Sequence, residues 1–331
     1  MNALEVNKLS IGYPDKKGDK VIQSDINLSL KAGQIISLMG QNGVGKTTFI
    51  KTISGLLEKL SGEVLYNNIP LAQLSPQQLA RELSVVLTEK PYSQNLSVLE
   101  LIAIGRHPYS SWMGTLTDHD KEVIDWAITE THINYLANKK LYELSDGQLQ
   151  KVMIARALAQ ETNIILLDEP AAHLDLYNKI EVMVLLRQIA QSGKAILIST
   201  HDMQVSTQLS DRLWLFNFNK PVKQGTPEDL IMNGTLEKTL FLEGYGYDMV
   251  HGTVDITRTG KEIQLSGTGD RLFWTKQALK RSGYSISDAA PITIEVMENN
   301  WQTSVGTKTF ESESIEELLI DLRKTEIKEG N

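Results

Sequence analysis

The sequence has no cysteine and no long apolar run, and each absence excludes a class of protein. Without cysteine, the 331-residue chain holds no disulfide scaffold, no thiolate metal site and no cysteine nucleophile. No stretch approaches the roughly 18 consecutive apolar residues that a membrane-spanning helix needs. The first residues, MNALEVNKLS, lack the charged-then-apolar pattern of an export signal. We therefore expect a cytoplasmic chain that reaches any membrane only through a partner.

An excess of positive charge is also missing. The chain carries 33 Lys plus Arg against 41 Asp plus Glu, a net charge of −8, which argues against a broad nucleic-acid-binding surface. With 41% hydrophobic and 22% charged residues the composition is that of a globular protein, so wholesale disorder is excluded. The length favours one large domain with an appendage.

What the sequence does have is a set of short, continuous apolar runs. Residues 34–39 contain IISLM and lead directly into the glycine-rich GQNGVGKT and then a helical pattern. Two similar runs occupy residues 164–167 and 195–199, and alternating patterns at 4–9 and 25–30 predict further strands. Runs this apolar are typical of parallel strands covered on both faces, so we predict an α/β fold.

The texture changes after about residue 244, and we predict two domains, 1–245 and 246–331. The second reads as β-β-α twice over, with one helix at 271–281 and another opening with a capping box of Ser314 and Glu317. This pattern predicts a small two-layer α+β domain. Within the first domain, residues of about 90–160 read as mostly helical.

The segment GQNGVGKT fits the phosphate-binding pattern G-x4-G-K-S/T without a mismatch. Its glycines allow backbone N–H groups to face a phosphate, and the following helix adds its positive N-terminus. Lys46 is predicted to reach the β- and γ-phosphates, and the Thr47 hydroxyl to bind Mg²⁺. The alternative is a glycine-rich turn that matches by chance. The predicted ATP-binding residues here are Gly40, Gln41, Asn42, Gly43, Val44, Gly45, Lys46, Thr47 and Thr48.

Acidic and histidine side chains follow the other two apolar runs. Asp168 ends the run IILLD and is predicted to bind Mg²⁺, and Glu169 is predicted to act as the general base on water. A solvated turn is the alternative for this pair. His201 follows ILIST, and we expect it to contact the γ-phosphate. A lone histidine is more often an ordinary surface or core residue.

A second anion site is predicted at the start of the apolar helix that follows LSDGQ. Ser145 and Gly147 lie at the N-terminus of this helix, where backbone N–H groups are free to bind an anion. Because the glycine-rich loop already provides one phosphate site, the simplest interpretation is that this end binds a nucleotide held by a second copy.

These motifs, in this order, resemble those of ATP-binding subunits of ABC transporters, over about residues 1–245. Ser145, Asp146, Gly147 and Gln148 resemble the LSGGQ signature, with Asp146 where glycine is usual. An acidic residue at a helix N-terminus is favourable, so this departure changes little. AHLD resembles the D-loop and includes Asp175. His201 matches the switch histidine.

Two further positions follow from the resemblance. Tyr13, in IGYP, matches the aromatic residue that stacks on adenine, although alone it is an ordinary strand-end tyrosine. Glu89, with Thr88 beside it, stands where the family usually has a glutamine that binds Mg²⁺. A carboxylate there is a further candidate metal ligand, but it adds negative charge near the triphosphate.

Residues 95–112 contain GRHPY and resemble the ATPases of iron–siderophore, haem and cobalamin importers. The resemblance implies a P-loop fold of the ABC type, with a mixed sheet, an antiparallel β part and a helical subdomain. In that family the subdomain forms a groove for a cytoplasmic helix of the permease. Leu96, Val98, Leu101 and Ile102 either shape such a groove or are local core.

The expected function is hydrolysis of ATP, with Mg²⁺, to drive import of an iron complex, with a ferric siderophore as first choice. The implied partners are a second copy, a separate polytopic permease and, indirectly, a substrate-binding protein, with no nucleic acid. The chain would be peripheral on the cytoplasmic face of the membrane. The alternatives are haem or cobalamin import, a soluble ABC ATPase of DNA repair or translation, and a regulatory module without turnover. The tail is expected to make contacts between the two copies; a regulatory domain and a packing extension are the alternatives.

Overall fold

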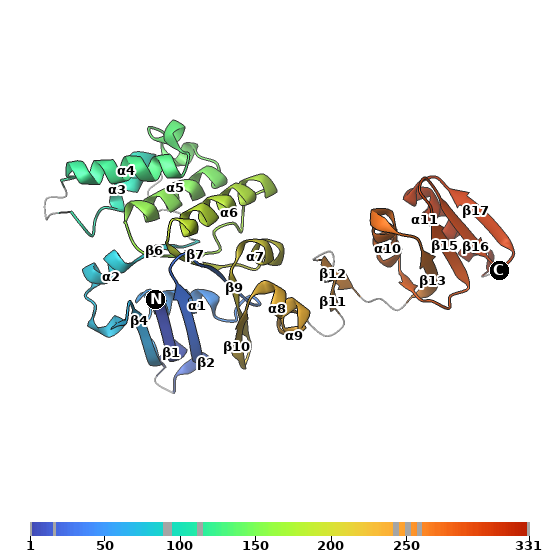
Figure 1. Ribbon diagram of the computed structural model, residues 1–331, viewed down its shortest axis with the longest axis horizontal. Helices are drawn as coiled ribbons and strands as arrows, with labels where there is room; N and C mark the ends of the chain where they lie inside the picture. The colour runs from blue at the N-terminus through green and yellow to red at the C-terminus, as the bar shows by residue number, and fades with distance from the viewer. Residues whose placement is uncertain are drawn as a thin grey trace. The chain divides into compact units, whose positions relative to one another are not determined.

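The computed structural model describes residues 2–15, 18–88, 95–110, 115–240, 245–248, 253–256 and 260–329 (Figure 1). The chain divides into two units, Met1–Leu240 and Phe241–Asn331. The sequence placed this boundary at residue 245. Each unit is described by itself below.

Two sheets build the first unit. In the antiparallel sheet the strand order is β2-β1-β4-β5, and in the second sheet it is β10-β9-β3-β8-β7-β6, with only β10 running antiparallel to its neighbour. The α/β fold with a mixed sheet and an antiparallel part, as predicted, is confirmed. The strands are β1 (Asn2–Tyr13), β2 (Lys20–Lys31), β3 (Ile35–Met39), β4 (Ser61–Tyr66), β5 (Ile69–Pro70), β6 (Leu83–Val86), β7 (Ile164–Asp168), β8 (Ala195–Ser199), β9 (Arg212–Asn217) and β10 (Lys220–Gly225).

Four helices of the first unit begin at capping boxes, in which side chains satisfy free backbone N–H groups. Ser75, Ser97, Thr117 and Ser145 each form a capping box with the residue three positions on, so the sequence itself marks where these helices start. The helices are α1 (Lys46–Ile53), α2 (Pro76–Glu82), α3 (Val98–Ile104), α4 (Asp118–Glu130), α5 (Asp146–Ala159), α6 (Leu176–Gln191), α7 (Met203–Leu209), α8 (Pro227–Met232) and α9 (Thr235–Leu240).

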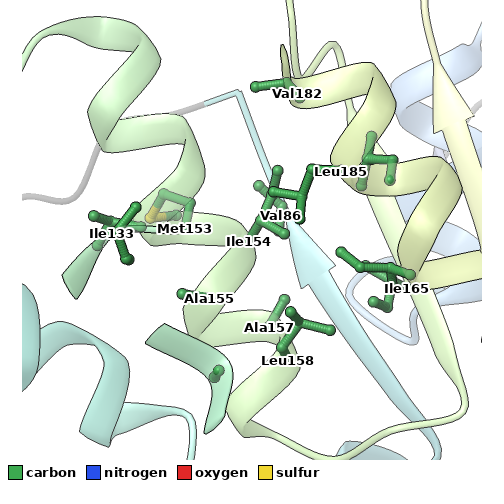
Figure 2. Close-up of a cluster of buried hydrophobic side chains, with 14 of the residues drawn as sticks. Val86, Ile133, Met153, Ile154, Ala155, Ala157, Leu158, Ile165, Val182 and Leu185 are labelled. Atoms are coloured by element: carbon green, nitrogen blue, oxygen red, sulfur yellow. The ribbon is translucent and has the colours of Figure 1, made fainter. Parts of the chain in front are cut away.

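The parallel strands β3, β7 and β8 are buried along their whole length, which explains their continuous apolar sequence. Alternate residues enter different cores. Ile165 and Leu167 point to one face of the sheet and pack with α3, α4, α5 and α6, as Figure 2 shows for part of this cluster. Leu166 and Leu197 point to the other face and pack with α1 and the antiparallel strands. Helices α5 and α1 therefore lie on opposite faces of one sheet.

The second unit contains a two-stranded antiparallel sheet, β11-β12, and a five-stranded sheet with helices against one face. The strand order is β14-β13-β15-β16-β17, with β13, β14 and β15 parallel and the others antiparallel. Ile263, Ile294 and Leu279 form its core together with Leu318 and Leu322. The elements are β11 (Tyr245–Asp248), β12 (Thr253–Ile256), β13 (Lys261–Ser266), α10 (Gly269–Arg281), β14 (Tyr284–Ile286), β15 (Ile292–Val296), β16 (Trp301–Val305), β17 (Lys308–Ser312) and α11 (Ile315–Glu329).

The predicted pattern of β-β-α twice over is wrong for this unit. Both helices were expected, and the Ser314 hydroxyl does cap the last one by accepting from the Glu317 N–H at 3.1 Å. Three strands were missed, because YGYD at β11 and YSI at β14 are short and KTFES at β17 is mostly polar. With β14 included, the first helix is a crossover between two parallel strands rather than the end of a hairpin.

Candidate functional site

The glycine-rich loop forms the turn between β3 and α1, as the sequence predicted. At Gly45 the backbone has φ 109°, and a Cβ added there would lie 2.6 Å from the Ile22 side chain. At Gly40 an added Cβ would lie 2.6 Å from the Phe216 carbonyl oxygen. Both positions therefore require glycine. Gln41, Asn42, Gly43 and Val44 complete the loop, with Val44 buried beneath it.

Lys46 is the first residue of α1 and is 7% exposed. Its ammonium donates to the carbonyl oxygens of Gly40 at 2.9 Å and of Gln41 at 3.4 Å. Burial lowers the pKa of Lys46, while the nearby Glu169 and Asp168 carboxylates act in the opposite direction. A cation therefore lies inside the loop, near two carboxylates that end the neighbouring part of the sheet.

The two threonines after Lys46 have different surroundings. Thr47 is exposed on the first turn of α1, whereas Thr48 is buried. The Tyr13 hydroxyl lies 3.5 Å from the Thr48 hydroxyl oxygen, which places this half-exposed ring at the end of β1 beside α1. Tyr13, Thr48 and the loop thus belong to one site.

Asp168 ends β7 and is 4% exposed. The Ser199 hydroxyl at the end of β8 donates to its carboxylate, and the Thr88 hydroxyl donates to its backbone carbonyl at 2.9 Å. The sequence analysis missed Ser199; its position as the last residue of the run ILIS was the available signal. Glu89, the candidate metal ligand, lies outside the described residues.

Glu169 and His201 follow two adjacent parallel strands and meet at their carboxyl ends. The His201 Nδ1 lies 2.8 Å from Glu169 Oε2. The Glu169 N–H donates to the Ser199 carbonyl oxygen at 3.0 Å, and Glu169 itself has φ 51°, a left-handed conformation that is uncommon for a non-glycine residue. The backbone is thus held so that the carboxylate faces the histidine.

The signature segment forms the N-terminus of α5. The Ser145 hydroxyl oxygen accepts from the Gln148 N–H at 3.3 Å, and both Ser145 and Asp146 are exposed. Gly147 is buried against α6, where an added Cβ would lie 2.4 Å from the Asn178 Oδ1. Helices α5 and α1 pack on opposite faces of the sheet. Asp146, at the start of α5, lines a small cavity together with Thr88 and Glu169.

Asp175 and Lys179, at the start of α6, connect this region with the histidine. Asp175 caps α6 by accepting from the Asn178 N–H at 2.8 Å, and this bond holds the pKa of Asp175 below its usual value. Lys179 donates to the Asp202 carboxylate at 2.5 Å, next to His201. Burial raises the pKa of Asp202, but Lys179, the Val205 N–H and His201 together outweigh it, so the pKa is lowered. The sequence analysis missed Lys179, because its partner is distant in sequence.

A groove of about 960 Å³ runs between α2, the end of α3 and the C-terminal end of α5. Its lining includes Leu56, Leu79, Ile104, His107 and Arg156. Burial lowers the pKa of Arg156, whose guanidinium donates to the Val85 carbonyl oxygen at 2.7 Å. Val98, Leu101 and Ile102, which the sequence left as groove or local core, belong to the buried core. Within the described part of the chain, no helix combines the length and apolar character needed to cross a membrane.

Comparison with known proteins matches residues 23–172 to the ABC transporter family and residues 260–323 to the iron ABC transporter C-terminal domain. The iron(3+)-hydroxamate import ATP-binding protein FhuC of Bacillus subtilis is 34% identical over 244 residues, which cover 73% of this chain and 89% of that protein. The chain therefore belongs to the ABC transporter ATP-binding family, and it is an ATPase of this class that binds nucleotide.

Solved structures agree with this assignment. A putative metal-chelate type ABC transporter in an inward-facing conformation has a TM-score of 0.64 and 25% identity, covering 77% of this chain and 95% of that one. The dimeric ABC transporter cassette MJ0796 has a TM-score of 0.60 and 25% identity, covering 68% of this chain and 98% of that one. Cassettes of this class thus form dimers. Within the second unit, the matched residues 260–323 correspond to the iron ABC transporter C-terminal domain, a family that the sequence motifs did not indicate.

Proposed function

We propose that the chain hydrolyses ATP on the cytoplasmic face of a membrane to drive import of a ferric siderophore through a separate permease. The observation that carries the catalytic part is the Glu169–His201 contact beside Lys46 and Asp168. The match of the second unit to an iron transporter domain, together with the similarity to a hydroxamate importer ATPase, supports an iron chelate as cargo.

ATP would bind along the loop between β3 and α1. The backbone N–H groups from Gly40 to Thr48 and the positive end of α1 suit the phosphates. Lys46 would exchange its two carbonyl partners for the β- and γ-phosphate oxygens, which is favourable because the bound state pairs a desolvated cation with anions. The Tyr13 ring, half exposed beside Thr48, would stack on adenine.

Hydrolysis requires a water molecule to attack the γ-phosphorus while it loses a proton. Glu169 would accept this proton, and ADP and inorganic phosphate would leave. His201 would hold a γ-phosphate oxygen and, through its contact at 2.8 Å, fix the Glu169 carboxylate. Thr47 and Asp168 offer the hard oxygen ligands that suit Mg²⁺, and Glu89 is a further candidate. When bound, Mg²⁺ would neutralise charge on the phosphates.

A second copy would complete each nucleotide site. The exposed N-terminus of α5, with Ser145, Asp146, Gly147 and Gln148, would face the nucleotide held by the other chain, and Asp175 would lie beside it. This arrangement fits the placement of α5 and α1 on opposite faces of the sheet. ATP held between two chains would favour the closed dimer, which gives the differential affinity that a ligand-driven switch requires.

The groove would receive a helical segment of a polytopic permease. Its apolar lining and the partly buried Arg156 suit an amphipathic helix with a carbonyl or carboxylate near that guanidinium. A substrate-binding protein would take part only through the permease, and the net charge of −8 argues against nucleic acid as a partner.

Two experiments test the proposal separately. Lys46→Ala is expected to abolish ATP binding measured with a fluorescent analogue, whereas unchanged binding would refute the assigned site. For the cargo, a strain lacking this gene should stop growing on ferric hydroxamates as sole iron source and should recover when the gene is restored. Growth that fails instead on haem, or a loss of cobalamin uptake, would replace the siderophore by one of those cargoes. Co-purification with nucleic acid or ribosomes would refute a transport role.

A further inference from the structure

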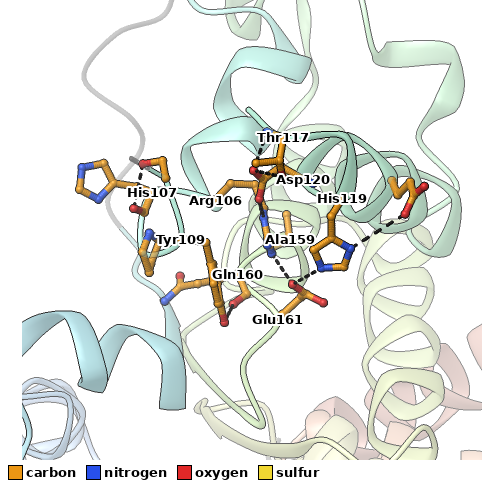
Figure 3. A network of polar contacts seen from close by, with 12 residues as sticks. Arg106, His107, Tyr109, Thr117, His119, Asp120, Ala159, Gln160 and Glu161 are labelled. Carbon is orange, nitrogen blue, oxygen red and sulfur yellow. Dashed lines mark hydrogen bonds and ion pairs between the residues drawn. The ribbon is translucent and has the colours of Figure 1, made fainter. Parts of the chain in front are cut away.

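The segment GRHPY is part of a buried polar cluster that the proposed function leaves without a role. Arg106 is 1% exposed, and its guanidinium lies among three acceptors (Figure 3). It donates to Asp120 Oδ1 at 2.8 Å, to the Ala159 carbonyl oxygen at 2.7 Å and to Glu161 Oε2 at 2.7 Å. These partners come from the start of α4 and the end of α5. One side chain therefore joins α3, α4 and α5.

Tyr109 adds a second hold on the end of α5. Its ring lies under the Arg106 guanidinium, 4.3 Å from the centroid, and its hydroxyl donates to the Gln160 carbonyl oxygen at 3.1 Å. The last carbonyl groups of α5, which have no partner within the helix, are thus bound by Arg106 and Tyr109. We call Arg106, Tyr109, Asp120, Gln160 and Glu161 the Arg106 cluster.

The same segment is also fastened to α2. The Pro108 carbonyl oxygen accepts from Gln77 at 3.1 Å and from two nitrogens of Arg81 at 3.0 and 3.2 Å. In addition, the side-chain amide of Gln160, just after α5, donates to the carbonyl oxygens of Ala80 at 2.6 Å and Leu83 at 3.0 Å. The end of α5 is therefore tied to α2 and to the start of β6.

These hydrogen bonds lie at the wall of the groove. Pro108 and Gln160 are among the residues that line it, as are Ala80 and Arg156. Helix α5 begins after its N-cap Ser145 and is 14 residues long, about 20 Å, so its C-terminal end is the one at the groove. A single rigid helix thus has the groove at one end and the signature segment at the other.

The Asp120 carboxylate of the cluster is held in its ionised form. The Thr117 hydroxyl and, to a smaller extent, Arg106 bind the Asp120 carboxylate and lower its pKa to about 2, although burial opposes them. A fully buried ion pair is weak evidence for a gain in stability, because desolvation offsets the attraction. Its geometric effect is clearer, since a planar guanidinium with three acceptors allows one orientation of the helices it joins.

We propose that Arg106 and Tyr109 are positioning residues that hold the C-terminal end of α5 against α2, so that a segment bound in the groove moves α5 and the Ser145 cap as one body. The proposal rests on the proposed function, because it deepens the role given to the groove and to the signature. The partner chemistry is a helical peptide segment seated beside His107 and Arg156.

The absence of cysteine allows a direct test in the full chain. Cysteines introduced at the exposed Asp125 on α4 and Glu63 on β4 would carry spin labels. Double electron–electron resonance would then report the distance between the label on α4 and the label on β4. Tyr109→Ala is expected to broaden this distance distribution and to lower kcat about tenfold with an unchanged KM for ATP, because a displaced cap misaligns the site of the other copy. Tyr135→Ala, which removes a 64% exposed tyrosine, is the matched control.

A folded Tyr109→Ala protein whose distance distribution and kcat equal those of the control would overturn the proposal. Tyr109→Phe removes only the hydrogen bond to Gln160, so it keeps the test available if Tyr109→Ala fails to fold. Arg106→Lys keeps the positive charge but loses the planar guanidinium, so it should behave like Tyr109→Ala. If Arg106→Lys instead shows the distance distribution of the unsubstituted chain, the guanidinium geometry does not position α5. The distance measurement needs no transport, so it can fail or succeed independently of the cargo.

Discussion

The two units of this chain bury their sheets differently. In the first, strands such as β7 and β8 are covered on both faces, so every side chain along them is buried. In the second, only one face of the sheet carries a core, and Gln264, Glu295 and Glu311 point to the exposed face. A sheet covered twice offers polar chemistry only at the strand ends, which is where Asp168, Glu169 and His201 lie. Burial of both faces of a sheet therefore confines its polar and titratable side chains to the ends of the strands.

The largest expected effect tests the base that we propose at the end of β7. Glu169→Gln should lower ATP turnover by about 10²–10⁴-fold, because the amide cannot accept the proton of the attacking water. Nucleotide binding should persist, because Lys46 and the loop are unchanged. Phosphate release and binding of a fluorescent ATP analogue would measure the two effects. Glu313→Gln, an exposed position of the second unit, is the control; equal turnover in both variants would place the base elsewhere.

Core substitutions compare the two units directly. Leu166→Ala in β7 and Ile294→Ala in β15 each remove a fully buried side chain and should each lower the free energy of unfolding by about 2–5 kcal/mol. Calorimetry with and without ATP would separate the units, since ATP stabilises only the unit that binds it. Ile294→Ala should leave the ATP-responsive transition unchanged. A single transition shifted by both variants would contradict two independent cores.

Acid should act on the first unit through Asp120. Its pKa is lowered from 3.8 to about 2, so the ionised carboxylate stabilises the folded state above pH 4, and this contribution, about 2 kcal/mol, is lost as the pH falls to 2. Asp120→Asn should therefore be less stable than the parent at pH 7, and the difference should shrink between pH 4 and pH 2. Urea unfolding at several pH values would show this. A constant difference across that range would argue against the lowered pKa.

A smaller effect is expected from the pair of Lys179 and Asp202. Lys179→Met should reduce kcat about fivefold, because the segment after His201 loses a partly buried ion pair worth about 1 kcal/mol, whereas the KM for ATP should not change. Steady-state kinetics at two salt concentrations would test this. Lys121→Met breaks the exposed pair with Asp118 and serves as control. If both variants lose the same activity, the pair has no specific effect.

The smallest effect on chemistry is expected from removing the second unit. A chain ending at Leu240 keeps every described residue of the candidate site, so its kcat at saturating protein concentration should stay within about twofold of the full chain. If the second unit joins two copies, the shortened chain should need more protein to reach half of that activity. An unchanged concentration dependence would argue against such contacts, and a large change in kcat would indicate regulation instead.

Sequence reasoning succeeded where the information is local. The loop from Gly40 to Thr47 and the strand ending at Asp168 were predicted because a few consecutive residues specify them. The contacts of Arg106 with Glu161 and of Lys179 with Asp202 were not, because each joins residues far apart whose pairing depends on how helices pack. In the second unit the helices were found by their periodicity. The strands β14 and β17 were missed because three residues, or a largely polar five, carry too weak an alternation.

The left-handed backbone of Glu169 makes stability and activity compete at one residue. A side chain there costs about 1–2 kcal/mol that glycine would not. Laboratory evolution of this chain for heat resistance alone should therefore accumulate glycine or asparagine at position 169 and yield sturdier proteins that bind ATP without consuming it. If Glu169 is the base that we propose, selection for stability alone would therefore select against ATP turnover while leaving nucleotide binding intact.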